Sequence, residues 1–202
     1  MKNYILDNLI KFISKSFPNY TEIQLKTIRY GLEGIYLTIT KTIIIFAIAI
    51  YLEIFKELLI IVILYNFLRM FSFGLHANNS LSCLVGSTII FIGITYLCTL
   101  VTITKIVKII VILICALLFI KYAPADTKKR PIISKKRRLI YKILSLNVLM
   151  IYLIIIFLSN NMFLTNAITS VTIVQTFLIS PLSYYIFKQP YNNALERRIA
   201  WG

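Results

Sequence analysis

The chain has 202 residues, of which 59% are hydrophobic, and its mean hydropathy is +0.84. This composition excludes a water-soluble globular domain and predicts an integral membrane protein. Lysine and arginine number 22 against 7 acidic residues. Such an excess is typical of cytoplasmic anchoring and attraction to anionic lipid, or of a partner that carries negative charge. Nucleic acid is not expected as a partner, because no nucleic-acid-binding motif accompanies the charge.

The first 34 residues predict amphipathic helices. Residues 3–17 place apolar side chains at helical spacing, while Asp7, Lys11 and Lys15 fall on the other side. Thr21 and Gln24 have the spacing of a capping box, so a second helix is expected to start there and to run towards Gly34. We expect residues 1–34 to lie in the membrane interface or against the bundle.

Apolar runs separated by polar junctions predict about six transmembrane helices within residues 35–187. The expected spans are 35–55, 58–75, a run from about Cys83, 109–120, and two within the uncharged stretch 143–187. Lys105 and Lys108 are expected in the turn between the third and fourth spans. The predicted fold is therefore an all-α, polytopic membrane helical bundle, a single domain over residues 1–202 with a basic tail at 188–202.

The strongest marker of topology is the basic loop, residues 121–142, which holds nine lysines and arginines against one acid, Asp126. With six spans, the basic loop, both termini and the region around His76 lie on one side of the membrane. The positive-inside rule places that side in the cytoplasm.

The stretch from Arg69 to Cys83 is the first candidate for chemistry, because it holds the only histidine, His76, and one of three cysteines. A thiol needs a nearby base to be a useful nucleophile at neutral pH. On a straight helix, residues seven apart are separated by about 10 Å along the axis, too far for a hydrogen bond. Gly74 and the turn formers between His76 and Cys83 allow a loop or bent helix that brings imidazole and thiol together.

Simpler interpretations exist for each of these residues. His76 is equally explained as an interfacial histidine, Cys83 as a small residue that begins a helix, and Arg69 as an interfacial anchor. An orienting third residue is not evident, although Asn78, Asn79 and Asp126 are polar candidates. Cysteine spacing suggests neither a disulfide framework nor a metal site, and no cofactor is expected.

Two motifs together resemble a known family. Arg69, Gly74, His76, Ala77 and Cys83 form the first, and the second runs from Tyr122, Ala123, Pro124 and Asp126 to Arg130, Pro131 and Ile132. At this separation they resemble the accessory gene regulator B proteins, membrane endopeptidases of Gram-positive quorum sensing. Phe73 stands where that family usually has the first of two adjacent glycines.

The resemblance implies that Cys83 is the nucleophile and His76 its base, with Arg69 and Gly74 as supporting motif residues. It implies a precursor peptide with an amphipathic leader and an acidic C-terminal tail, which is released while a thiolactone or lactone signal forms through an acyl-enzyme thioester. It also implies a homodimer in the cell membrane. The expected binding residues for the acidic tail are those of the basic loop: Lys128, Lys129, Arg130, Lys135, Lys136, Arg137 and Arg138.

Two other functions remain open from the residues alone. A peptide transporter or exporter would use polar groups within the bundle, such as Lys41, Glu53, Asn147 and Gln175. A membrane scaffold would use neither His76 nor Cys83.

Overall fold

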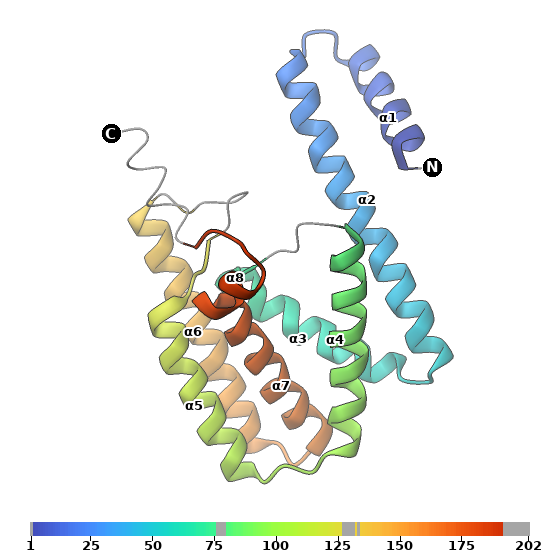
Figure 1. Ribbon diagram of the computed structural model, residues 1–202. Helices are drawn as coiled ribbons and strands as arrows, with labels where there is room; N and C mark the ends of the chain where they lie inside the picture. The colour runs from blue at the N-terminus through green and yellow to red at the C-terminus, as the bar shows by residue number, and fades with distance from the viewer. Residues whose placement is uncertain (1, 76–79, 127–131, 133, 192–202) are drawn as a thin grey trace. The chain divides into compact units, whose positions relative to one another are not determined.

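The computed structural model describes residues 2–75, 80–126, 132 and 134–191, and for residues 80–83 the backbone only. The chain divides into two compact units, residues 1–53 and 54–202, which are described separately. Helices form almost all of the described structure, and the described residues contain no sheet (Figure 1). The prediction of an all-α membrane helical bundle is therefore confirmed.

The first unit is a pair of antiparallel helices, α1 (Lys2–Ser16) and α2 (Glu22–Tyr51). Two ion pairs join them: Lys2 to Glu33 at 2.6 Å, and Asp7 to Arg29 at 2.7 Å. The Thr21 hydroxyl accepts from the Gln24 amide, and both halves of the predicted capping box are present. The amphipathic first helix and the start of the second are thus confirmed.

Helix α2 continues through Gly31 and Gly34, so the second helix and the first span predicted separately are one element. At about 1.5 Å per residue it is about 45 Å long, against about 30 Å of bilayer hydrocarbon. Its charged first turns therefore extend beyond the hydrocarbon region, and its apolar second half is the part suited to span.

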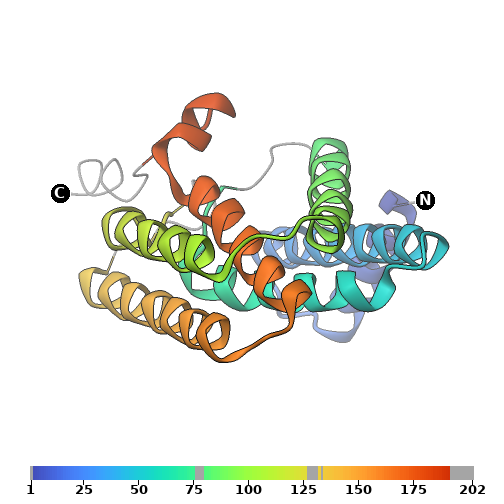
Figure 2. The same cartoon turned by 90° about the horizontal axis from the view of Figure 1, so that it is seen from below.

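The second unit has six described helices, five of which pack around the sixth, α7. They are α3 (Phe55–Ser72), α4 (Ser80–Leu100), α5 (Lys105–Tyr122), α6 (Lys135–Leu158), α7 (Met162–Ile179) and α8 (Pro181–Ile186). Helix α7 contacts each of the other five, and Figure 2 shows it between α4 and α5. Its sequence contains no charged residue, which allows it to be enclosed on most sides.

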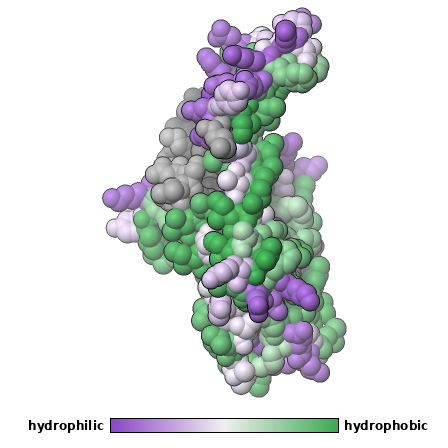
Figure 3. Space-filling view, turned by 90° about the vertical axis from the view of Figure 1, so that its right-hand side faces the viewer, coloured by the Kyte–Doolittle hydropathy of each residue, from purple (hydrophilic) through white to green (hydrophobic). Residues whose placement is uncertain are grey.

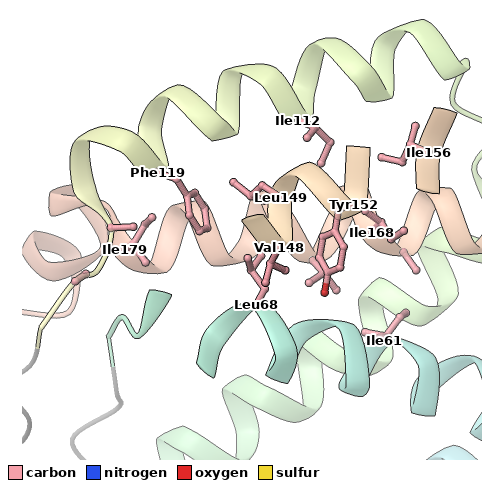
Figure 4. Packing of buried hydrophobic residues seen from close by; sticks show 14 of the residues in the cluster. Ile61, Leu68, Ile112, Phe119, Val148, Leu149, Tyr152, Ile156, Ile168 and Ile179 are labelled. Carbon is pink, nitrogen blue, oxygen red and sulfur yellow. The ribbon is translucent and has the colours of Figure 1, made fainter. Parts of the chain in front are cut away.

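Buried aliphatic and aromatic side chains from α3, α5, α6 and α7 form the core of this unit (Figure 4). Phe119, Leu149 and Ile168 are at most 2% exposed. Tyr152 also belongs to the core, and its hydroxyl donates to the Leu64 carbonyl at 2.6 Å. This bond satisfies a polar group that would otherwise be costly inside the bundle.

Three described helices, α2, α6 and α7, are long and apolar enough to cross a membrane, and Leu84–Leu100 of α4 is a shorter apolar helix. Helices α3 and α5 are as long as α7 but carry three charged residues each. The outer face of α5 exposes Ile106, Ile110, Leu113 and Leu117, as a lipid-facing helix would. Hydrophobic side chains cover much of the face in Figure 3.

The assignment of Lys108 to a turn is wrong. Lys108 lies inside α5, is 1% exposed and donates to the Thr165 hydroxyl at 2.7 Å. The turn is made by the residues before Lys105, where α5 begins.

Candidate functional site

Helix α3 ends immediately before the predicted site, at a change of backbone direction that we call the α3 break, Phe73–Leu75. Phe73 has φ 56° and ψ −131°, and Gly74 has φ 113°. A side chain at Gly74 would place its Cβ 3.1 Å from the Leu178 carbonyl oxygen. Glycine is therefore required at position 74 by both conformation and space.

Phe73 occupies a backbone region that costs a non-glycine residue about 1–3 kcal/mol. The conformation is the one a glycine would adopt without strain, which fits the glycine usual at this position of the family motif. Its ring packs edge-on against Tyr141, with centroids 4.9 Å apart, and this contact offsets part of the cost.

Main-chain bonds connect the α3 break to the segment after α5. Gly74 N–H donates to the Ala125 carbonyl at 3.0 Å, and Ala125 N–H donates to the Ser72 carbonyl at 3.1 Å. Leu75 N–H donates to the Leu178 carbonyl at the end of α7, also at 3.1 Å. The described parts of the two motifs, about 50 residues apart in the sequence, are thus side by side at Ser72–Gly74 and Ala125.

Arg69 holds the α3 break through its side chain. It lies in the last turn of α3, and its guanidinium donates to the Leu75 carbonyl at 2.7 Å and to the Tyr65 hydroxyl. The same guanidinium lies 5.4 Å from the centroid of the Tyr65 ring. Arg69 is therefore not simply an interfacial anchor, because it holds the carbonyl directly before His76.

His76 lies outside the described residues, as do Asn78 and Asn79. Cys83 is in the first turn of α4, where only the backbone is described. Helix α3 ends at Ser72 and α4 begins at Ser80, so the chain leaves the helix before His76 and re-enters it before Cys83. The distance between imidazole and thiol remains a prediction.

Asp126 anchors the second motif. Its side chain is 1% exposed and lies 3.6 Å from the guanidinium of Arg138 in the first turn of α6. Its carbonyl accepts a hydrogen bond of 2.9 Å from the Tyr184 hydroxyl. Burial, together with the nearby Asp126 carboxylate, raises the pKa of Tyr184, so this hydroxyl stays protonated and remains a donor.

The basic loop divides into a paired and an exposed part. Arg138 forms an ion pair with Asp126, and its contribution to binding of the substrate tail stays a prediction. Lys135, Lys136 and Arg137 are exposed at the start of α6. Lys128, Lys129 and Arg130 lie outside the described residues.

Sequence reasoning did not assign Gln175 or Tyr184 to this site. Gln175 is fully buried in α7 and donates from Nε2 to the Ser72 hydroxyl at 2.7 Å and to the Phe73 carbonyl at 2.5 Å. An amide in an uncharged run was the available signal, but its partner on α3, Ser72, is 103 residues away and could not be identified from spacing.

Comparison with known proteins gives a consistent family. The model of the family described as accessory gene regulator B matches residues 6–179. An AgrB-like protein of Clostridium acetobutylicum is 27% identical over 96% of this chain and 95% of its own. Accessory gene regulator protein B of Staphylococcus saprophyticus is 26% identical over 89% and 97%, respectively. An AgrB-like protein of Clostridium perfringens is 33% identical over 77% of each chain. No solved structure matches.

Proposed function

Because the chain belongs to the accessory gene regulator B family, we propose that it is a membrane-embedded cysteine endopeptidase that processes a quorum-sensing precursor peptide. Cys83 is the nucleophile and His76 its general base and acid. The active site faces the cytoplasm, and the protein acts as a homodimer in the cell membrane.

The observation that carries this proposal is the fixed α3 break. Arg69, Ala125 and Leu178 hold the backbone of residues 74 and 75, directly before His76. Cys83 follows in the first turn of α4, and the amino end of a helix favours a negative charge such as a thiolate. Catalytic groups need a rigid support of this kind to keep reactive geometry.

The reaction proceeds by two acyl transfers. The Cys83 thiolate attacks the carbonyl that ends the signal sequence, and the His76 imidazolium protonates the departing amine of the tail. The C–N bond breaks and a thioester to Cys83 forms. A cysteine thiol of the precursor then loses its proton to His76 and attacks this thioester. Cys83 leaves as thiolate, and the precursor closes into a thiolactone.

The start of α6 supports recognition of an acidic tail. Lys135, Lys136 and Arg137 carry positive charge at the helix end where the dipole disfavours it. An anionic partner would relieve this repulsion, and Lys128, Lys129 and Arg130 would add to the attraction. Replacing the three exposed residues by glutamine should raise KM for an acidic-tailed precursor only. An equal rise for a precursor with a neutral tail would count against this role.

The transporter alternative finds less support. Glu53 is exposed in the turn after α2, Asn147 is exposed on α6, and the Gln175 amide is bonded to α3.

The test uses the short precursor reading frame expected beside the gene. The protein is co-expressed with this precursor as wild type, Cys83→Ala, Cys83→Ser and His76→Ala, with Cys115→Ala as a buried-thiol control. Tail release and a hydroxylamine-sensitive mass adduct on Cys83 are expected for wild type and Cys115→Ala only. Tail release that survives in Cys83→Ala would refute the proposal.

A further inference from the structure

Gln175 connects the most enclosed helix of the bundle to the α3 break. Its side chain is fully buried, and its Nε2 bonds to Ser72, the last residue of α3, and to Phe73, the first residue beyond it. The Phe73 carbonyl can only accept, so the amide must present its NH2 group there. The orientation of Gln175 is therefore determined by its partners.

The same amide leaves a polar atom without a partner. Gln175 Oε1 is buried and forms no hydrogen bond with the described residues. An apolar side chain of similar volume at this position would avoid that cost. The glutamine instead forms two bonds, one to the Ser72 hydroxyl and one to the Phe73 carbonyl, and Phe73 is three residues before His76.

We propose that Gln175 is a positioning residue. Its amide holds the Ser72 hydroxyl and the Phe73 carbonyl, so that the chain leaves α3 in the direction that places His76 against Cys83. This inference rests on the proposed His76–Cys83 pair. It assigns to α7 a role in the reaction beyond that of packing.

Chemical reactivity of the Cys83 thiol tests this role without a precursor. The full chain in lipid nanodiscs, with Cys98→Ala and Cys115→Ala to remove the other thiols, is alkylated with iodoacetamide between pH 5 and pH 10. A paired imidazolium keeps the thiolate populated in mildly acidic solution. The alkylation rate plotted against pH gives a reactivity profile. Where the thiol is mostly protonated, each pH unit by which this profile moves upward lowers the rate about tenfold.

The variants separate positioning from packing. His76→Ala is expected to move the reactivity profile to higher pH, and Gln175→Met to move it most of the same distance. Gln175→Glu, which is neutral when buried and retains one donor, should give an intermediate profile. The matched control is Thr172→Val on the same helix, because among the described residues this buried hydroxyl donates within α7, to the Ile168 carbonyl. Its profile should equal that of wild type.

Each outcome is decisive. If wild type and His76→Ala give the same profile, the pair itself is refuted and the role of Gln175 falls with it. If His76→Ala moves the profile and both Gln175 variants do not, the positioning role alone is overturned. If Gln175→Met does not give a monodisperse protein, Gln175→Glu and Ser72→Ala replace it under the same criterion. A shift in Thr172→Val equal to that in Gln175→Met would also overturn the inference.

Discussion

The backbone conformation of Phe73 predicts that glycine gives a more stable protein than alanine at this position, the reverse of their usual order. With φ 56° and ψ −131°, this position costs any non-glycine residue about 1–3 kcal/mol. Phe73→Ala keeps that cost, whereas Phe73→Gly removes it. The greater freedom of glycine in the unfolded chain offsets about 0.5–1 kcal/mol. The glycine variant is therefore expected to be more stable than the alanine variant by about 1 kcal/mol.

Comparing the two variants with each other cancels the loss of the aromatic ring. Both lose the edge-on contact with Tyr141, which contributes about 0.5–1.5 kcal/mol beyond the buried area. A comparison with wild type would mix this loss with the relief of strain.

Thermal unfolding in nanodiscs measures the difference, and for a chain of this size 1 kcal/mol corresponds to roughly 2–4 °C. Met70 is the matched control, because it is exposed within regular α3. There the glycine variant should be the less stable one by about 1 kcal/mol. If Phe73→Ala unfolds at the same temperature as Phe73→Gly or higher, the strain assigned to this position is refuted.

Three further predictions concern the contacts around the break. Arg69→Lys should lower kcat/KM for tail release about tenfold or more with little change in unfolding temperature. An ammonium does not reproduce the planar guanidinium that donates to both Tyr65 and Leu75. An unchanged kcat/KM would contradict this. Arg138→Met should lower the free energy of unfolding by about 1 kcal/mol or more beyond the loss in Asp126→Asn, because it leaves a buried carboxylate without that guanidinium. Equal losses of unfolding free energy in the two variants, measured by chemical denaturation, would contradict this. Tyr184 has a raised pKa in the folded protein, so its contribution to stability is complete below about pH 10 and is lost as the pH rises above that value. Tyr184→Phe should therefore show a shallower loss of unfolding free energy above pH 10, and an identical slope would refute this reasoning.

Features determined by neighbouring residues were predictable from the sequence. The capping box at Thr21 and Gln24 spans only four residues, so its spacing identifies the start of α2. The apolar runs predicted the helices of the second unit for the same reason. Gly74 was recognised as a position of backbone freedom, and the structure shows why the chain needs it there.

Features determined by distant partners were not predictable. Lys108 has the spacing of a turn residue, but Thr165, its partner, is 57 positions away. Arg69 binds a main-chain carbonyl, which every residue carries and no sequence pattern reveals. The strain at Phe73 arises because the bonds of Ala125 to Ser72 and Gly74, on either side of Phe73, and of Gln175 to the Phe73 carbonyl override local preference. The site is therefore visible in the sequence as a set of residue types, and its geometry is not.

The bonds that fix the α3 break also determine which substitutions the site tolerates. Three of them join main-chain atoms on both sides, from Gly74 to Ala125, from Ala125 to Ser72 and from Leu75 to Leu178. None of these three bonds uses a side chain, although the buried Ser72 hydroxyl also bonds to Gln175, and Gly74 is restricted by its backbone angle and space. The path of the chain into the site is therefore held largely by main-chain atoms, so a change of side chain at the partly buried Leu178 can leave that path unchanged.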